Sequence, residues 1–304
     1  MEITRNTLGK STLEVSSLGL GTMSLLSKNA AESTKIVHKA LEAGVNFLDT
    51  ADLYEKGENE KLIGKTIANK RDQVVLATKV GNQWREDGSG WDWKASGPYI
   101  IKHVEESLKR LGTDYIDLYQ LHGGMIEDPI DEIIEAFEAL KKQGKIRFYG
   151  ISSIRINVIK AYLKRSNISS IMMQYSLLDR RPEEILDTIA DNQVGVISRG
   201  VLAQGLLLKK PLKNYLGYNA FQIEQLRNKV REVAQEHQVT PLHVVWDYVR
   251  SNGAITSLLA APSSMKQLDE LLEVHKTKLP IDRKEYDQLF GNLLPPIFYT
   301  EHRE

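Results

Sequence analysis

The chain has 304 residues, of which 41% are apolar and 26% are charged, a composition typical of globular proteins. Forty basic residues balance forty acidic ones, so no overall field attracts nucleic acid or an anionic membrane. There is no cysteine, which excludes disulfides and thiolate chemistry, and no apolar run is long enough for a membrane span or a signal peptide, so we expect a cytoplasmic protein.

Short apolar runs alternate along the chain with longer segments of helical period. The runs are 17–22, 45–50, 74–79, 115–122, 146–152, 170–176, 194–200 and 254–260. Between them, apolar residues recur at i, i+3, i+4 and i+7, as in 96–112 and 128–145, which predicts amphipathic helices. Gly112 and Gly144 follow charged last turns, and Asp128 followed by Pro129 predicts an N-cap and a first helical residue.

Eight such alternations without a flexible linker predict one (β/α)8 TIM barrel, an α/β fold, as a single domain over residues 1–304. We also expect an N-terminal β-hairpin in residues 3–14 and extra C-terminal helices. An open doubly wound sheet is the alternative, but it usually has fewer strands and a glycine-rich fingerprint that is missing here. Two segments outside the strands are expected to be loops: 81–93, which holds three of the four tryptophans, and 208–220.

Polar residues follow the predicted strands, at the end where barrels of this kind carry their chemistry. These residues are Asp49, Lys79, His122, Ser152, Ser153, Gln174, Ser198 and Arg199. Each alone could be an ordinary strand end. A carboxylate, an amine and an imidazole on three successive strand ends would, however, face a common central cavity.

Tyr54, on the loop after Asp49, adds a phenol to this set. Tyrosine phenols ordinarily have a pKa of about 10 and are poor proton donors or acceptors at neutral pH. A nearby lysine ammonium favours the phenolate form, and a carboxylate keeps that lysine charged and oriented. Asp49, Tyr54, Lys79 and His122 would then form a general acid aimed at a carbonyl oxygen. Reduction also needs a hydride donor, which without cysteine or a metal-ligand cluster must be an organic cofactor.

The segment after the last strand offers a phosphate site. Ser263 or Ser264 can cap the next predicted helix, whose first N–H groups together with the hydroxyls would bind a phosphate. The loop after the seventh strand, RGVLAQGLL (199–207), offers glycines for close backbone approach. Ser263 could also serve only as an N-cap.

These residues, in this order and over nearly the whole chain, resemble those of the aldo-keto reductase family. The similar segments are LGKSTLEVSSLGLGTMS, NFLDTADLYEKGENEKLIG, LATKV, DYIDLYQLH, GISSI, MMQYSLLDR and VISRGVLAQGLL. The resemblance implies NADPH-dependent reduction of small aldehydes or ketones without a metal. It implies Tyr54 as proton donor, Lys79 and Asp49 as the groups that tune it, and His122 as the group that orients the carbonyl.

The resemblance also implies a cofactor site. The expected cofactor-binding residues are Gly21, Thr22, Asp49, Ser152, Gln174, Ser198, Arg199, Gly200, Leu202, Gln204, Gly205, Ser263, Ser264 and Gln267. Ser152 and Gln174 match positions that hold the nicotinamide carboxamide. Arg199 stands where many members have an aromatic ring under the nicotinamide, and a guanidinium can stack there too.

Trp84 and Trp91 are candidates for the substrate pocket wall, although the 81–93 loop could also pack on the barrel rim. Gly123 and Gly124 replace bulkier residues of many relatives, and we expect them to open the substrate site. His275 and three further histidines in helical segments are interpreted as surface or packing residues, and no metal site is predicted.

Two other functions are consistent with the sequence. Lys79 could form a Schiff base in an aldolase-type lyase. Alternatively, the chain could be a cofactor-binding redox sensor or regulatory subunit of a partner protein. The complete set of four polar residues favours the reductase.

Overall fold

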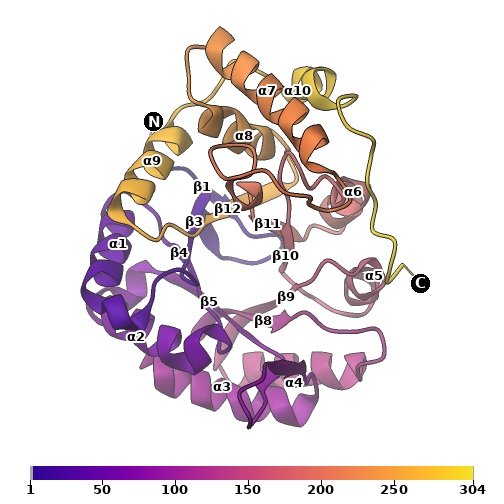
Figure 1. The fold of residues 1–304 in the computed structure, drawn as a ribbon. Helices are drawn as coiled ribbons and strands as arrows, with labels where there is room; N and C mark the ends of the chain where they lie inside the picture. The colour runs from indigo at the N-terminus through magenta and orange to yellow at the C-terminus, as the bar shows by residue number, and fades with distance from the viewer. Residues whose placement is uncertain (1–2, 304) are drawn as a thin grey trace.

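Eight parallel strands close into a barrel in the computed structural model, which describes residues 3–303 (Figure 1). The order around the barrel is β10-β11-β12-β3-β4-β5-β8-β9. The strands are β3 Leu18–Gly21, β4 Phe47–Asp49, β5 Val75–Val80, β8 Ile116–His122, β9 Ile146–Ser152, β10 Ser170–Gln174, β11 Gly195–Arg199 and β12 Ile255–Ala260. Each overlaps one of the eight apolar runs, so the predicted barrel is confirmed.

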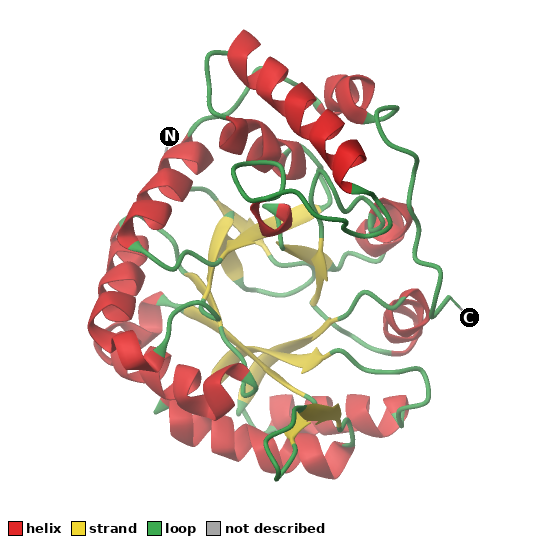
Figure 2. Cartoon of the chain, in the orientation of Figure 1, coloured by secondary structure: helices red, strands yellow, loops and turns green. Residues whose placement is uncertain are grey.

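Helices surround the barrel as an outer ring (Figure 2). They are α1 Ala30–Glu42, α2 Glu58–Ile67, α3 Gly97–Leu111, α4 Ile130–Lys142, α5 Ile156–Arg165, α6 Glu183–Asp191, α7 Ala220–Glu236, α8 Pro241–Arg250, α9 Met265–Lys276 and α10 Arg283–Phe290. None of them, within the part of the chain that the structure describes, could cross a membrane. Helix α4 begins one residue later than predicted, with Pro129 at the N-cap. The Asp128 carboxylate accepts a hydrogen bond from the Met125 N–H at 2.6 Å and does not cap the helix.

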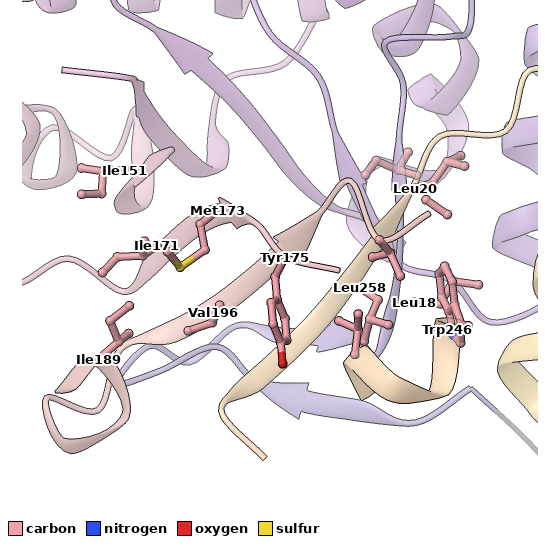
Figure 3. Packing of buried hydrophobic residues seen from close by; sticks show 14 of the residues in the cluster. Leu18, Leu20, Ile151, Ile171, Met173, Tyr175, Ile189, Val196, Trp246 and Leu258 are labelled. Atoms are coloured by element: carbon pink, nitrogen blue, oxygen red, sulfur yellow. The ribbon is translucent and has the colours of Figure 1, made fainter. Parts of the chain in front are cut away.

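Apolar side chains of the strands face both ways, as in a parallel sheet that is covered on both sides. The outward side chains pack against the helices, and Figure 3 shows part of this layer around Tyr175, Val196 and Trp246. A second cluster fills the barrel interior. It consists of Leu8, Leu13, Val15, Phe47, Val75, Ala77, Leu118, Met172, Ile197 and Leu259.

The predicted N-terminal hairpin is present as β1 Arg5–Thr7 and β2 Glu14–Ser16. Leu8, Leu13 and Val15 belong to the interior cluster, so the hairpin closes the end of the barrel opposite the strand C-termini. The segment 81–93 is not an irregular loop as expected. It forms a second antiparallel hairpin, β6 Asn82–Trp84 with β7 Trp91–Trp93.

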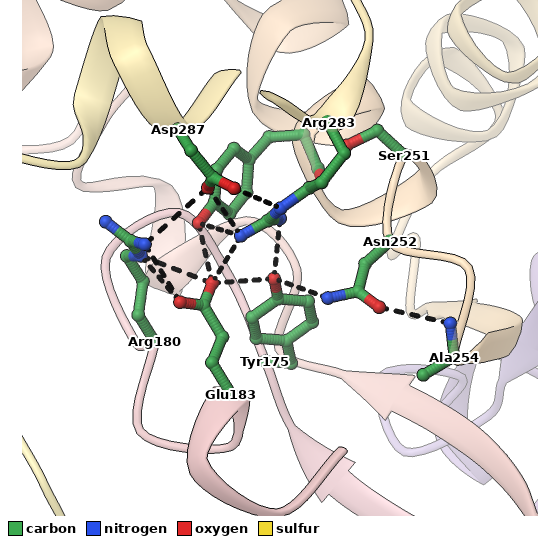
Figure 4. Close-up of polar contacts among 9 residues, drawn as sticks. Tyr175, Arg180, Glu183, Ser251, Asn252, Ala254, Arg283 and Asp287 are labelled. Carbon is green, nitrogen blue, oxygen red and sulfur yellow. Dashed lines mark hydrogen bonds and ion pairs between the residues drawn. The ribbon is translucent and has the colours of Figure 1, made fainter. Parts of the chain in front are cut away.

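The last helix, α10, is attached to the barrel through a charged network (Figure 4). Arg283 donates to Glu183 at 2.8 Å and to the Tyr175 hydroxyl at 2.9 Å, and Arg180 also pairs with Glu183 at 2.9 Å. Beyond α10, the chain runs over α6 and α5 to the C-terminus (Figure 1). The network therefore fixes the start of a tail that ends near the site described next.

Candidate active site

Three neighbouring strands bring the predicted polar residues to one end of the barrel. Asp49 ends β4, Lys79 lies one residue before the end of β5, and His122 ends β8. Tyr54 opens a short 3-10 helix, Tyr54–Gly57, in the loop after β4. Because β4, β5 and β8 are adjacent and parallel, these four side chains meet at the C-terminal mouth.

The Lys79 ammonium is the centre of this group. Its Nζ donates to Asp49 Oδ2 at 2.6 Å, to the Thr50 carbonyl at 2.7 Å and to the Tyr54 hydroxyl at 3.3 Å. A lysine ammonium has three N–H groups, so all of its donors are used. Since the Tyr54 oxygen accepts from Lys79, its own O–H can be donated elsewhere.

Lys79 and Asp49 form a buried ion pair. Burial by itself lowers the pKa of Lys79, but the charges of Asp49 and Tyr54 outweigh it, and the net pKa is raised. Burial raises the pKa of Asp49, while Lys79 and the Gln120 amide oppose this. Both Asp49 oxygens accept hydrogen bonds, from Lys79 and from Gln120 at 3.3 Å, which is the geometry of a carboxylate.

His122 carries no charge at neutral pH. Burial first, then the charges of Lys79 and Arg199, lower its pKa to about 3. The rings of His122 and Tyr54 meet edge to face, with centroids 6.3 Å apart and an interplanar angle of 87°. A neutral imidazole next to a phenol can share a carbonyl oxygen with it as a hydrogen-bond donor.

These side chains line a cavity of about 810 Å³. Among the predicted site residues, those that line it are Gly21, Thr22, Asp49, Tyr54, Lys79, Trp91, His122, Ser152, Arg199, Gly200, Leu202 and Gln204. The predicted residues outside its lining are Trp84, Gln174, Ser198, Gly205, Ser263, Ser264 and Gln267. The cavity therefore unites the four polar residues with one part of the expected cofactor set.

The side chains of Ser198 and Gln174 are engaged by other groups. The Ser198 hydroxyl is fully buried and donates to the Tyr175 carbonyl at 3.2 Å. The Gln174 amide nitrogen donates to Asp179 at 2.9 Å and to the Tyr215 hydroxyl at 2.7 Å, which leaves its oxygen as an acceptor. Ser198 is thus a backbone-bracing residue in this structure, whereas Gln174 can still accept one amide hydrogen.

The predicted phosphate site lies at the start of α9, outside the cavity lining. Ser264 is the N-cap, and its hydroxyl accepts from the Gln267 N–H at 3.3 Å. The Gln267 side-chain oxygen accepts from the Ser263 N–H at 2.8 Å and from its hydroxyl at 3.1 Å. The three residues meet as predicted, but a phosphate there would have to displace the Gln267 side chain.

The aromatic hairpin forms one wall of the cavity through Trp91 and Trp93, whose rings lie edge to face 4.8 Å apart. Trp84, a predicted pocket residue, is not part of the cavity lining and donates its indole N–H to the Leu53 carbonyl at 3.3 Å. Gly123 lines the cavity, but the space next to it is not empty. A Cβ at position 123 would lie 2.0 Å from the Trp93 ring, so this ring occupies the space.

Sequence reasoning missed several lining residues, among them Asn82, Arg155, Trp246, Glu301 and His302. Trp93 lies in the same tryptophan-rich segment as Trp91, and the sequence did not distinguish which of the three tryptophans there lines the pocket. Glu301 and His302 belong to the C-terminal tail, and no local pattern connects that tail with the barrel mouth. Within residues 3–303, no group of three or more histidine, aspartate or glutamate side chains is arranged to hold a metal ion.

The residues at the mouth fit a nicotinamide. The Ser152 hydroxyl makes no hydrogen bond within the described part of the chain and could donate to a carboxamide, whose N–H could be accepted by Gln174. Among the described residues, the Arg199 side chain donates one hydrogen bond, a long one of 3.4 Å to the Gln174 amide oxygen, and its guanidinium is exposed to the cavity. The planar guanidinium can stack on a planar ring.

Comparison with known proteins agrees with this geometry. The model of the aldo/keto reductase family matches residues 17–289. The Bacillus subtilis protein YqkF, described as an uncharacterized oxidoreductase, is 49% identical over 276 residues, which cover 88% of this chain and 89% of YqkF. The holo form of aldo-keto reductase AKR11C1 from Bacillus halodurans is similar over 100% of both chains, with 45% identity and a TM-score of 0.92. Its apo form gives a TM-score of 0.85 with 42% identity over the same coverage.

Proposed function

Because the chain belongs to the aldo/keto reductase family and is therefore an oxidoreductase, we propose that it reduces aldehydes or ketones to alcohols, with NADPH as hydride donor and Tyr54 as general acid. The observation that carries this proposal is the hydrogen bond from Lys79 to the Tyr54 oxygen, at the bottom of a cavity large enough for a nicotinamide and a small substrate. NADPH would supply the hydride to the carbonyl carbon.

The protein side chains would bind the carbonyl oxygen and protonate it. His122 is neutral and could donate a hydrogen bond that holds this oxygen in place. Tyr54 donates its O–H proton to the oxygen as the carbonyl π bond breaks and the alcohol O–H bond forms. The Lys79 ammonium stabilises the phenolate that is left, because it already points at the phenolic oxygen. Asp49 keeps Lys79 charged and oriented.

The cofactor would lie along β9 to β12. Ser152 and Gln174 would hold the carboxamide, and Arg199 would stack under the ring, next to the backbone of Gly200. The start of α9, with Ser263 and Ser264, would bind phosphate through its first N–H groups once the Gln267 side chain is displaced. Preference for NADPH over NADH would depend on Lys266, the nearest cationic side chain in the sequence of that turn.

A Schiff-base lyase is disfavoured by the state of Lys79. Schiff-base formation needs a neutral amine with a lone pair, whereas the pKa of Lys79 is raised and all three of its N–H groups are donated. Borohydride treatment with a carbonyl substrate should therefore leave no adduct on Lys79. A trapped adduct would support the lyase.

The proposed reaction is tested by following the oxidation of NADPH, and separately of NADH, in the presence of a panel of aldehydes and ketones. Oxidation that requires the carbonyl compound and yields an equal amount of alcohol supports the reductase. A protein that binds NADPH tightly but turns over no member of the panel would instead be the redox sensor.

A further inference from the structure

A second arginine lines the cavity, and the proposed reaction makes no use of it. Arg155 lies in the loop between β9 and α5, two strands away from Arg199 in the barrel order. Its guanidinium has no carboxylate partner within ion-pair distance among residues 3–303. Burial raises the pKa of the Asp128 carboxyl and the charge of Arg155 acts to lower it, but the two side chains form no ion pair. Arg155 is therefore a positive charge in the cavity without a direct carboxylate partner among the described residues.

The Arg155 guanidinium is nevertheless held in place. Its Nη1 donates to the Gly124 carbonyl at 3.0 Å, and its central carbon lies 4.9 Å from the centroid of a Trp93 ring. Stacking on an aromatic face stabilises the cation without neutralising it. Of its five N–H groups, one is used, and Nε is shielded from solvent without a partner in the described chain. The group is oriented and retains unused donors.

Arg155 is also close to the groups that would handle the carbonyl. Gly123 and Gly124, which follow His122 directly, form the wall on which both Trp93 and the guanidinium rest. His122 precedes this wall in the sequence, and Arg155 is bound to the Gly124 carbonyl at its other end. A substrate whose carbonyl oxygen reaches Tyr54 and His122 would extend along it towards the arginine.

The C-terminal tail closes the other side of this region without neutralising Arg155. The Asn157 N–H donates to the His302 carbonyl at 2.8 Å, and an ion pair of 2.8 Å between Arg303 and Glu184 fixes the tail. Glu301 lines the cavity rim, but its side chain is 85% exposed and forms no ion pair with Arg155.

We propose that Arg155 binds a carboxylate of the substrate, so that this site prefers carbonyl compounds that carry an anionic group away from the reacting carbonyl. The inference rests on the proposed function, because it assigns a substrate class to the same cavity. An arginine fork matches the two oxygens of a carboxylate, and Trp93 beside it suits an apolar linker between the two ends of the substrate.

The test compares para-carboxybenzaldehyde with its methyl ester, which differ in charge but share the ring and the aldehyde. The ratio of kcat/KM for the acid over the ester should fall about ten- to hundredfold in Arg155→Gln, because charge-assisted hydrogen bonds are lost. Arg155→Lys should keep part of the ratio, since it keeps the charge but not the fork. The matched control is Lys160→Gln, which removes a positive charge from an exposed position of α5 and should keep the parent ratio.

A binding measurement separates this inference from the reaction itself. Benzoate, which cannot be reduced, is titrated against the tryptophan fluorescence of the parent protein and of Arg155→Gln, and the variant should bind about ten- to hundredfold more weakly. Equal benzoate affinity together with an unchanged acid-to-ester ratio overturns the role of Arg155. If the parent reduces neither aldehyde, the proposed reaction fails, while the benzoate titration still decides whether the carboxylate subsite exists.

Discussion

Lys79 and Asp49 form an ion pair of 2.6 Å in which neither side chain is more than 5% exposed. Two opposite charges that are buried together stabilise each other, but either one alone would remain in a medium that disfavours it. The pair therefore couples the stability of the barrel mouth to its chemistry. It holds the ammonium that points at the Tyr54 oxygen.

Replacing Lys79 with methionine should therefore damage both properties. The variant leaves Asp49 buried without its partner, which should lower the free energy of unfolding by about 3–5 kcal/mol. Carbonyl reduction should fall about 10²- to 10⁴-fold, because the tyrosine loses the charge that stabilises its phenolate. Urea unfolding and kcat with a reducible aldehyde measure the two effects.

A double variant separates the effect of Lys79 on stability from its effect on activity. Lys79→Met combined with Asp49→Asn removes both charges and should recover much of the lost stability, but none of the activity. A double variant that regains activity together with stability would show that Lys79 serves only the fold.

Gly123→Ala should disturb the aromatic wall. Its backbone has a φ of +102°, and the new methyl group would lie 2.0 Å from the Trp93 ring. Gly144, with a φ of +75° and open space of at least 4 Å where a Cβ would lie, provides the control. Gly144→Ala should cost about 1–2 kcal/mol through backbone strain alone, whereas Gly123→Ala should cost about 1–3 kcal/mol more through the clash.

Urea unfolding measures the two losses, and tryptophan fluorescence reports on the wall. The emission spectrum should change in Gly123→Ala and stay as in the parent in Gly144→Ala. Equal losses of stability, with identical spectra, would mean that Trp93 moves away without strain.

His275 should make the protein less stable in weak acid. Burial, followed by the charge of Arg250, lowers its pKa to about 4. Its Nδ1 accepts from the Trp246 indole at 3.2 Å and its Nε2 lies 2.8 Å from the Ser17 hydroxyl, so the neutral ring with a proton on Nε2 fits both contacts.

In acid, His275 binds a second ring proton. The unfolded chain binds it more readily than the folded protein, since an exposed histidine has a pKa of about 6.5. The contribution of neutral His275 to the free energy of unfolding is therefore fully present above about pH 6.5. It decreases by about 3 kcal/mol in total as the pH falls towards about 4. Urea unfolding across this range measures the loss, and it should be smaller in His275→Gln. The same pH dependence in that variant would assign the loss to other groups.

The sequence predicted the features that depend on local pattern. Strands such as Val75–Val80 are apolar on both faces, which marks them as parallel and internal, and the barrel follows from their number. Because a barrel gathers the ends of its strands, Asp49, Lys79 and His122 could be assigned to one cavity from their positions alone. The contacts of Lys79 and His122 with Tyr54 are consistent with that assignment.

The features that the sequence did not predict depend on contacts between distant segments. Trp93 fills the space at Gly123, thirty positions away, so a missing side chain in one loop is replaced by a ring from another. His302 reaches the cavity because α5 binds the tail through its backbone, which leaves no trace in residue types. The hairpin at 82–93 has strands too short for a visible alternation.

The most direct test of the proposed mechanism compares the parent protein with Tyr54→Phe, which loses only the phenolic oxygen. NADPH binding, measured by the change in nicotinamide fluorescence, should be equal in both proteins. Aldehyde-dependent oxidation of NADPH should fall by a factor of about 10²–10⁴ in the variant, because phenylalanine has no acidic proton to give to the carbonyl oxygen. If Tyr54→Phe reduces the aldehyde at the parent rate, Tyr54 is not the acid and the account of this site is contradicted.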